Sequence, residues 1–378
     1  MKFLFTVASY YPAVGGVQMV TQCTAEELVR QGHEVTVLIS HSDNIYEQKT
    51  LNNVQLMYYD LRTEKDKIIG DKTHYVRFLT ELCKNVDVLI NVSVHSALTD
   101  AILPYIKKLN CKKILYLHGI YDFKWSKQDK SSVIRILSKI YYNLRRSYFY
   151  SKLYKFAKNY DYIIHLSEDD ISMKYMKRHG ITQNLVIHNS AERAFFEPPV
   201  LKCNEKYFLQ VANYAEHKNQ EYSLEAFYKS KCKNIKMVYI GSNKNSYYEH
   251  LIEVNKKLIK KYGEKTVEFL TDMDRNDIIE KFKHATAIIL SSRVEKFPMV
   301  LVEGLACGVP FISTDCGSVK SLPGGFVIDS IDEMAECMEK LETTSNITID
   351  LKEKGYEYAY QNFSLEKNIK ALIEKLEE

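Results

Sequence analysis

Apolar and polar positions alternate along the first half of the chain in a pattern that predicts strands and helices in turn. Short apolar runs bounded by turn residues indicate buried strands. These runs lie at residues 3–9, 34–40, 86–92, 113–119 and 162–167. Stretches with helical periodicity separate the strands, and the first of them, residues 21–32, ends at Gly32. Strands that alternate with helices are typical of a parallel sheet covered by helices on both faces.

The same alternation restarts in the second half of the chain. Predicted strands lie at residues 204–213, 235–241, 267–272, 286–292 and 310–315, with predicted helices at 221–230, 277–285 and 299–308. Polar residues and the pair Pro198–Pro199 interrupt the periodicity within residues 188–199. We therefore predict an α/β protein with two successive doubly wound domains, at 1–195 and 196–360.

Length and composition agree with this division. A chain of 378 residues is long for one domain, and 46% hydrophobic with 26% charged residues is ordinary for a globular protein. We expect no membrane-spanning helix, because no apolar run approaches about 18 residues, and the N-terminal apolar run is too short for a signal peptide. The eight cysteines include no CxxC pair, so we expect neither a zinc site nor a disulfide framework, and a cytoplasmic location.

Ligands of such sheets bind beyond the carboxyl ends of the strands, and the first strand-end candidate is the pair Gly15–Gly16. Glycines between a strand and a helix allow a tight turn and close approach of an anion to the helix N-terminus. The spacing is not GxGxxG, which argues against a dinucleotide site. An ordinary strand-to-helix turn explains two glycines equally well.

Two single residues also follow predicted strands. His118 comes directly after the strand at 113–117, where an imidazole can donate to or polarise a substrate. Lys218 lies between the first strand and the first helix of the second domain, where it can neutralise a phosphate. Each residue type at such a place is also compatible with a purely structural role.

The fourth candidate is RVEKFPMVLVEGLACGVP, residues 293–310, in which Glu295 and Glu303 lie eight positions apart. Pro298 suits the first turn of a helix, because its missing N–H costs nothing there. Glu295 then lies in the loop and Glu303 lies within an apolar helix. A buried carboxylate needs a partner, and ribose hydroxyls are suitable ones. The helix macrodipole offers an alternative account of Glu295, but a weaker one of Glu303.

The segment at 293–314 resembles the E-x7-E signature of retaining glycosyltransferases of the GT-B fold, especially family 4. The likeness runs through nearly the whole chain. It includes GGVQ at 15–18, VIHNSAE at 186–192, VANYAEHKN at 211–219 and the closing helix at 363–378. The paired glutamates with their ACGVP tail are specific, whereas the glycines or Lys218 alone are not.

This resemblance implies two Rossmann-like domains that face each other across a cleft, an acceptor-binding one at 1–195 and a nucleotide-sugar-binding one at 196–360. It implies that the helix at 361–378 packs back on the N-terminal domain. It further implies a hexosyltransferase that moves a sugar, most simply from a UDP-sugar, to a glycan or lipid-linked saccharide in surface polysaccharide synthesis, with retention of anomeric configuration.

The resemblance also assigns roles to the candidates. Glu295 would contact the transferred sugar, Glu303 the ribose hydroxyls and Lys218 the diphosphate. Gly15–Gly16 would approach the phosphates from the other domain, and His118 would line the sugar side. The remaining donor-binding residues would lie around the helix N-terminus that follows Glu295. They are Phe297, Met299, Val300 and Leu301, the last three through their backbone amides.

The chain departs from the family pattern at two places. Asn213 stands where the family usually carries an arginine, five residues before Lys218. Loss of that cation would weaken leaving-group stabilisation by about 1–3 kcal/mol unless Arg293 or Lys296 compensates. Lys296 itself stands where the family often has a glycine.

The triplet Asp272–Met273–Asp274 spells DxD, a motif that binds divalent metal in a different glycosyltransferase fold. Here Asp274 precedes RNDIIEKF, with Asp277 three residues on. That arrangement predicts a helix cap followed by an acid in the first turn. We therefore expect no metal ion, and no other cofactor, because the nucleotide-sugar is a substrate.

Residues 124–158 carry ten lysines and arginines but one acid, with aromatic residues interleaved. A basic, aromatic stretch of this kind suits docking on an anionic membrane surface, which predicts peripheral attachment at the inner face of the membrane. A solvated helical face is the alternative. Nucleic acid is not expected, because no nucleic-acid-binding motif accompanies the charge.

Two other functions fit the same pattern. One is a non-catalytic GT-B partner subunit, which Asn213 favours and which the joint presence of Glu295, Glu303 and Lys218 disfavours. The other is a nucleotide-sugar epimerase, for which the sequence supplies no further acid or base. Which sugar, base, acceptor and linkage are used, and the oligomeric state, do not follow from the sequence.

Overall fold

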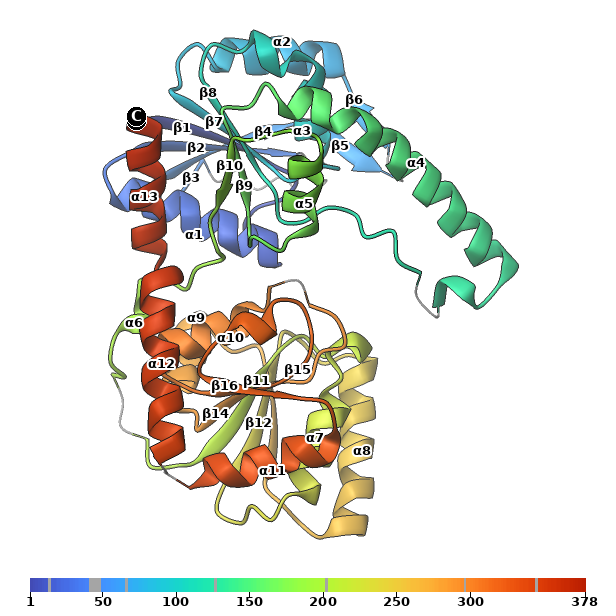
Figure 1. Ribbon diagram of the computed structural model, residues 1–378, viewed down its shortest axis with the longest axis vertical. Coiled ribbons are helices and arrows are strands. Elements are labelled where there is room, and N and C mark those ends of the chain that lie inside the picture. Colours follow the sequence, from blue (N-terminus) through green and yellow to red (C-terminus); the bar gives the residue numbers. More distant parts are fainter. Residues whose placement is uncertain are drawn as a thin grey trace. The chain divides into compact units, whose positions relative to one another are not determined.

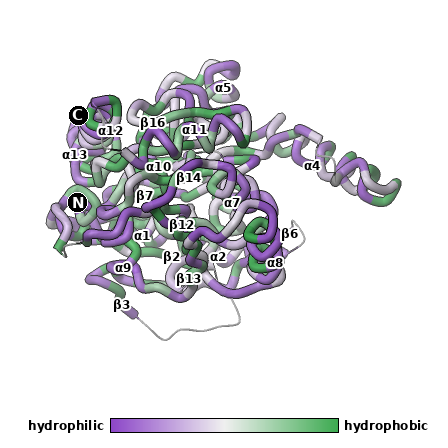
Figure 2. The backbone as a smooth tube through the Cα atoms, turned by 90° about the horizontal axis from the view of Figure 1, so that it is seen from below, coloured by the Kyte–Doolittle hydropathy of each residue, from purple (hydrophilic) through white to green (hydrophobic). Residues whose placement is uncertain are grey.

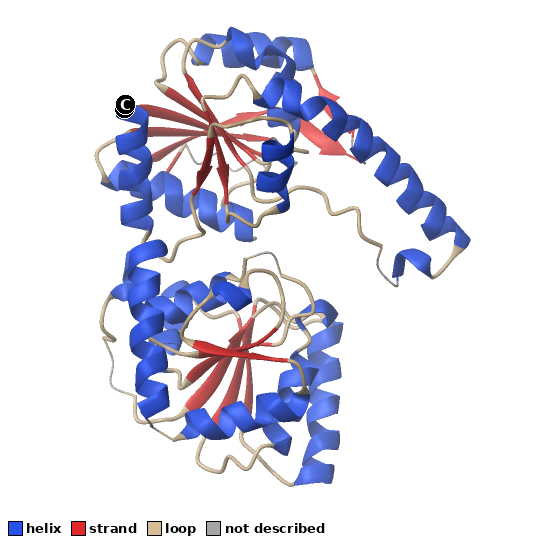
Figure 3. Ribbon diagram, viewed as in Figure 1, coloured by secondary structure: helices blue, strands red, loops and turns tan. Residues whose placement is uncertain are grey.

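The computed structural model describes residues 1–12, 15–40, 49–64, 67–125, 128–200, 203–295, 297–343 and 346–378. The chain divides into two compact units, Met1–His188 and Asn189–Glu378. Each unit contains a sheet with helices packed on its faces (Figure 3). The prediction of two successive doubly wound α/β domains is therefore confirmed.

The N-terminal unit is built on an eight-stranded sheet with the order β10-β9-β8-β7-β1-β2-β4-β3. Every neighbouring pair is parallel except β3 and β4. A separate antiparallel hairpin, β5–β6, follows β4 in the chain. The strands are β1 (Lys2–Val7), β2 (Glu34–Ser40), β3 (Thr50–Leu51), β4 (Val54–Tyr59), β5 (Leu61–Glu64), β6 (Lys67–Gly70), β7 (Val88–Val92), β8 (Lys112–Tyr116), β9 (Tyr162–His165) and β10 (Asn184–Val186).

Helices connect these strands and cover the sheet (Figure 1). The central strand β7 is buried along its whole length, as expected for a strand with helices on both faces. The helices are α1 (Gly16–Arg30), α2 (Lys72–Leu82), α3 (Ala97–Ile102), α4 (Val133–Ala157) and α5 (Ile171–Arg178), with short 3₁₀ turns η1 (Leu103–Lys108) and η2 (Gln128–Lys130).

The C-terminal unit has a fully parallel six-stranded sheet with the order β13-β12-β11-β14-β15-β16. The chain runs outward from β11 in one direction and then returns to place β14 on the other side of β11. The strands are β11 (Tyr207–Val211), β12 (Lys236–Gly241), β13 (Val267–Thr271), β14 (Ala287–Leu290), β15 (Phe311–Thr314) and β16 (Gly325–Ile328).

Two groups of helices cover the two faces of this sheet. Helices α7, α8 and α11 bury their apolar residues in one core cluster, and α9, α10 and α12 bury theirs in another. The helices are α6 (Arg193–Phe196), α7 (Gln220–Lys229), α8 (Ser246–Tyr262), α9 (Arg275–His284), α10 (Met299–Ala306), α11 (Ile331–Glu342), α12 (Asn346–Asn362) and α13 (Leu365–Glu377), with 3₁₀ turns η3 (Glu216–Lys218) and η4 (Val319–Ser321). Helix α13 belongs to the second unit. Whether it packs on the N-terminal domain, as the family resemblance implies, stays a prediction.

Helix α4 differs from the other helices because only its C-terminal part is buried in a core. Tyr150, Leu153 and Ala157 are buried, whereas the first half of the helix projects from the sheet of its unit (Figures 1 and 2). From its start as far as Tyr148 the helix exposes an apolar stripe of Val133, Ile134, Leu137, Ile140, Tyr141, Leu144 and Tyr148. None of the helices in the described part of the chain combines the length and apolar character that crossing a bilayer requires.

Candidate active site

Strands β11 and β14 bring two of the predicted site residues together. They are adjacent and parallel, with Leu209 opposite Ile288, so both strands end at the same edge of the sheet. The chain reverses its direction across the sheet between them, which is the topological switch point where open α/β sheets bind ligands. Lys218 follows β11 and Glu295 follows β14.

Lys218 and Glu295 form an ion pair at this edge. The Lys218 Nζ donates to Glu295 Oε1 at 2.6 Å, although 77 positions separate the two residues in the sequence. Their side chains are 23% and 16% exposed. The pair is therefore mostly shielded from water, although both side chains keep some exposure.

A buried hydrogen-bond network holds the backbone beneath the ion pair. Ser291, at the end of β14, donates from its hydroxyl to the Lys218 carbonyl at 3.0 Å. Gln210 of β11 donates to the same hydroxyl at 2.9 Å and accepts from Ser223 of α7 at 2.6 Å. Ser291, Gln210 and Ser223 are all at most 2% exposed. Three elements thus fix the loop that presents Lys218.

The N-terminus of helix α10 lies on the same loop as Glu295. Pro298 is the N-cap residue, and Met299 begins the helix, as predicted. The first amides of a helix lack acceptors within it, but Leu301 N–H already donates to the Pro298 carbonyl at 3.1 Å. Of the three amides expected to meet an anion, those of Met299 and Val300 are therefore the better candidates.

Phe297, the other expected donor-binding residue, has a half-buried side chain. Its ring packs edge-on against Phe363 at a centroid distance of 5.6 Å. This contact fixes the residue that lies between Glu295 and the helix. Its predicted role stays a prediction.

Glu303 has a partner that the sequence did not reveal. Its carboxylate is 6% exposed, and its Oε1 accepts from Arg275 Nη2 at 2.7 Å. Arg275 also donates to Glu192 from Nε and Nη2, at 3.1 and 2.7 Å, and stacks over the Phe195 ring. The expectation that this buried carboxylate needs a partner is met by an arginine from α9, and its predicted contact with ribose hydroxyls stays a prediction.

The charges of this cluster depend on one another. Burial raises the pKa of Glu303, and Arg275 partly opposes that rise. The pKa of Arg275 is raised by the two carboxylates, which together outweigh its burial. Arg275 follows a helix cap in a polar stretch, and no periodicity singles it out. The one signal in the sequence for such a partner was Glu303 itself, because a buried carboxylate needs a counter-charge.

Asn213 is exposed directly after β11, and its carbonyl accepts from Gln220 at 3.0 Å. Of the two candidate replacements for the family arginine, Arg293 is exposed beside the Lys218 loop. It donates through its backbone to the His217 carbonyl at 2.9 Å and from its guanidinium to Glu216 at 3.2 Å. Arg293 thus supplies a cation at this edge. Lys296 lies outside the described residues.

Asp274 caps helix α9 as predicted. Its side chain accepts from the backbone N–H groups of Asn276 and Asp277, at 3.0 and 3.1 Å. Among the described residues, no group of three or more His, Cys, Asp or Glu side chains is arranged to hold a metal ion. Asp274 of the DxD triplet therefore has a structural role, and metal dependence stays untested.

The other predicted site residues lie in the N-terminal unit. His118 is half-buried just beyond β8, with its ring stacked on Tyr116 at 4.4 Å. Gly15 is the N-cap of α1, and Gly16 is its first residue. A Cβ at Gly16 would meet no atom of the described residues within 4 Å, and Gly15 has an extended φ of −172°. Packing within the chain therefore does not explain Gly16.

Two family models match successive parts of the chain. Glycosyltransferase Family 4 matches residues 14–191, and Glycosyl transferases group 1 matches residues 192–362. Together they span most of the sequence. The chain therefore belongs to the glycosyltransferase family that these two models describe, family 4/group 1, and it is a glycosyltransferase.

One relative and two solved structures resemble this chain over nearly its whole length. N-acetyl-alpha-D-glucosaminyl L-malate synthase of Bacillus anthracis is 23% identical over 387 residues, covering 94% of this chain and 92% of that protein. Anabaena Alr3699/HepE, solved with UDP, has a TM-score of 0.73 at 16% identity, with 100% of both chains covered. WaaG, a glycosyltransferase involved in lipopolysaccharide biosynthesis, has a TM-score of 0.63 at 17% identity, with 97% of both chains covered. These likenesses confirm the GT-B fold.

Proposed function

We propose that this glycosyltransferase moves a sugar from a UDP-linked donor to a saccharide or lipid-linked saccharide in surface polysaccharide synthesis, with retention of configuration. The observation that carries the proposal is the meeting of Lys218, Glu295 and the start of α10 at the switch point of the second sheet. A diphosphate needs a cation and free amides, and a sugar needs a carboxylate that accepts from its hydroxyls.

Donor binding in this proposal exchanges one ion pair for another. Lys218 leaves Glu295 and meets the diphosphate, and Glu295 is released toward the sugar hydroxyls. The exchange keeps a positive charge where the leaving group becomes more negative in the transition state, which is where stabilisation raises the rate. The amides of Met299 and Val300 and the Arg293 guanidinium add to that potential.

Glu303 binds the ribose in this proposal, and Arg275 keeps its carboxylate charged and oriented. A carboxylate has two oxygens and accepts several hydrogen bonds, so the contact of Arg275 with Oε1 is compatible with a ribose hydroxyl on the other oxygen. The rest of the reaction follows from the groups present. The acceptor hydroxyl attacks on the side of the departing diphosphate, and a phosphate oxygen takes its proton.

The positive charge for the leaving group comes from the protein in this scheme, so we propose that no metal ion is required. On the acceptor side, the basic helix α4 with its exposed apolar stripe supports attachment to an anionic membrane surface. We place the enzyme in the cytoplasm, peripheral to the inner face of the membrane.

A thermal-shift panel of nucleoside diphosphates and nucleotide-sugars tests the donor site, because a ligand that binds the native state raises Tm. UDP should raise the Tm of the wild type, and the shift should shrink strongly in Lys218→Gln. Lys229→Gln is the matched control, since Lys229 pairs with Asp332 on the same unit away from the site. A chelator should leave the UDP shift unchanged. If no nucleotide shifts the wild type, the donor proposal is wrong.

Turnover separates the alternatives that remain. Release of UDP that depends on an added saccharide or lipid-linked acceptor supports transfer. Binding of UDP-sugars without any turnover would favour the non-catalytic partner subunit, which the exposed Asn213 suggests. Interconversion of the donor sugar without acceptor would favour an epimerase.

A further inference from the structure

A hollow of about 570 Å³ lies in the N-terminal unit, and none of the residues assigned to the donor lines it. The C-terminal half of α4 forms one wall, and β6, the start of α2 and the α3–η1 turn form the others. The loop after β7 also lines it through His95. The hollow therefore adjoins the carboxyl edge of the sheet, where ligands of such sheets bind.

Cations dominate the polar lining of this hollow. Five basic residues face one acid, Asp100. The basic residues are Lys67, Lys72, Arg145, Arg146 and Lys152. Within the described part of the chain, neither Lys67 nor Lys72 forms an ion pair with a carboxylate. Cations from three different elements converge here, which is unlike a simple solvated helix face.

The single acid does little to offset these cations. Asp100 is deeply buried, and burial raises its pKa to about 7, so about half of its population is neutral at neutral pH. Its Oδ1 accepts from the His95 N–H at 3.0 Å. Asp100 thus holds His95, a non-glycine residue with a left-handed φ of 64°, in place at the rim.

His95 adds a neutral polar group. Burial, together with Arg146 and Arg145, lowers its pKa to about 3, so the ring is uncharged at neutral pH. It packs against Phe149 at 4.4 Å, and its Nε2 shares a hydrogen bond with the Tyr150 hydroxyl at 2.8 Å. The ring is therefore fixed rather than free to follow a ligand.

The remaining wall of the hollow is apolar. Its residues come from β6, η1 and α4. They are Ile68, Leu103, Pro104, Phe149, Leu153 and Phe156. A site that combines cations with apolar side chains matches an anion that carries a hydrocarbon chain, since each part of such a ligand meets its own kind of surface.

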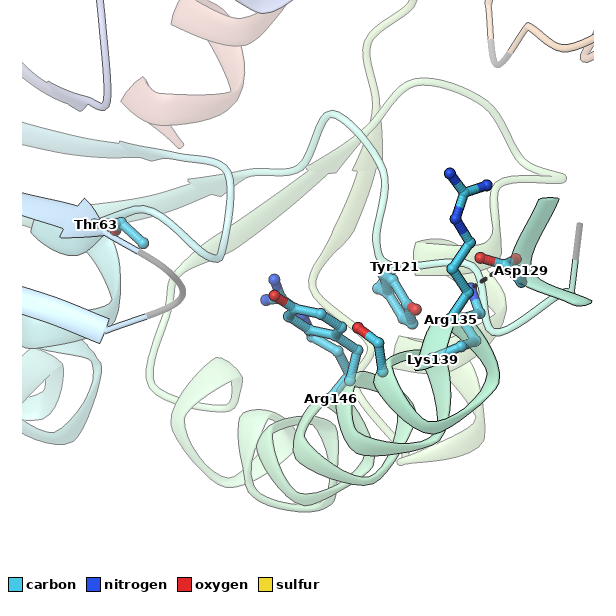
Figure 4. Close-up of a pocket in the computed structure, with 8 residues that line it drawn as sticks. Thr63, Tyr121, Asp129, Arg135, Lys139 and Arg146 are labelled. Atoms are coloured by element: carbon cyan, nitrogen blue, oxygen red, sulfur yellow. Dashed lines mark ion pairs between the residues drawn. The ribbon is translucent and has the colours of Figure 1, made fainter. Parts of the chain in front are cut away.

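A neighbouring hollow, which shares Arg146, is less suited to such a ligand (Figure 4). There Lys139 pairs with Asp129 at 3.9 Å and lies over the Tyr121 ring at 5.0 Å. Arg146 lies over the same ring at 5.6 Å. Figure 4 shows Tyr121 between Asp129 and Arg146. Lys152 of the first hollow is likewise engaged, with Tyr148, so the difference lies in the apolar wall: the described residues that line the neighbouring hollow include no aliphatic side chain.

We propose that the hollow formed by α4, β6 and the loop after β7 binds the phosphate and adjoining apolar chain of a lipid-phosphate acceptor. Lys72, Arg145 and Lys152 meet the phosphate, and Ile68, Phe149 and Phe156 meet the chain. The identity of the occupant as an acceptor rests on the proposed transferase function. The inference that the hollow binds a phosphate ester with a hydrocarbon tail does not rest on that function.

Dodecyl phosphate, used below its micelle concentration, is the probe. It should raise the Tm of the full chain, whereas inorganic phosphate at the same concentration should raise it less and dodecyl maltoside should not raise it. The double variant Lys72→Gln/Lys152→Gln should weaken the apparent affinity for dodecyl phosphate by about tenfold or more, because two charge-assisted contacts are lost.

The matched control is Lys155→Gln/Lys158→Gln, which removes the same charge from the C-terminal end of α4 and its C-cap, outside the hollow. It should retain most of the shift. Equal loss in the two double variants, or an equal shift with dodecyl maltoside, would overturn the proposal in favour of general basicity or general detergent binding.

Flotation with phosphatidylglycerol vesicles separates a single lipid phosphate from the bilayer surface. Ile134→Ser/Leu137→Ser alters only the exposed stripe of α4, so it should lose flotation and keep the dodecyl phosphate shift. The opposite result, with flotation lost only in Lys72→Gln/Lys152→Gln and no shift by dodecyl phosphate, would assign the hollow to bilayer headgroups and overturn the acceptor site.

UDP measured on the same preparations keeps the two proposals distinct. A UDP shift without a dodecyl phosphate shift would refute the hollow and leave the transferase proposal standing. A dodecyl phosphate shift without a UDP shift would support the hollow and refute the proposed donor site. An unchanged UDP shift in the double variants also shows that they are folded.

Discussion

Arg275 is expected to stabilise the C-terminal unit by holding the buried Glu303 carboxylate. Removing one partner of a buried ion pair typically costs about 3–5 kcal/mol, because the other charge is left uncompensated. Arg275 is 35% exposed, so solvent screens part of its effect, and we expect Arg275→Gln to cost about 2–3 kcal/mol. For a unit of this size that corresponds to a fall in Tm of about 4–12 °C.

Calorimetry of the full chain measures this effect, since two units can unfold in separate transitions and only one should shift. Arg193→Gln is the control. Arg193 lies in the same unit and pairs with Glu197 at 3.1 Å, but both side chains are more than half exposed, so its loss should cost less than about 1 kcal/mol. Adding Glu303→Gln to Arg275→Gln should restore much of the lost stability, because it removes the uncompensated charge.

The pH dependence gives an independent check. The pKa of Glu303 is already raised by burial, and loss of Arg275 raises it further. An acid with a raised folded-state pKa binds more protons in the native state, so stability falls as pH rises through that pKa. The deficit of Arg275→Gln should therefore be smaller at about pH 5 than at about pH 7.5. A Tm equal to that of the wild type, or no recovery in the double variant, would refute the reasoning.

Three further predictions follow from the same contacts. Glu295→Gln should bind UDP at least as tightly as the wild type in calorimetric titration, because Lys218 no longer has to leave an ion pair, while transfer falls by about 100-fold; weaker UDP binding would contradict the exchange. Gly16→Ala should leave Tm within about 1 °C yet impair donor turnover, and unimpaired turnover would show that no ligand approaches there. Gly324→Ala should cost about 2–4 kcal/mol in denaturant unfolding, because φ is +87° and the added Cβ would lie 2.7 Å from the Gly355 Cα; Gly263→Ala, at φ +93° in open space, should cost less.

Local sequence carried much of the fold. Apolar runs of strand length depend on neighbouring residues only, so they located the five central strands of the first sheet and five of the six strands of the second. Helices α8, α11 and α12 were not predicted. The cap at Asp274 is equally local, since an N-cap side chain bonds to amides two and three residues on. The paired glutamates at 295 and 303 were visible because one loop and one helix contain both.

The tertiary structure alone decided what those residues contact. Lys218 meets Glu295 because β14 pairs with β11 in one register, and no periodicity reports the pairing of strands so far apart in sequence. The partner of Glu303 came from α9, where nothing local marks Arg275. The hollow beside α4 also needed the fold, because its cations come from separate elements. Hydrophobic periodicity is a short-range signal, whereas ion pairs and cavities depend on which distant segments the packed sheet brings together.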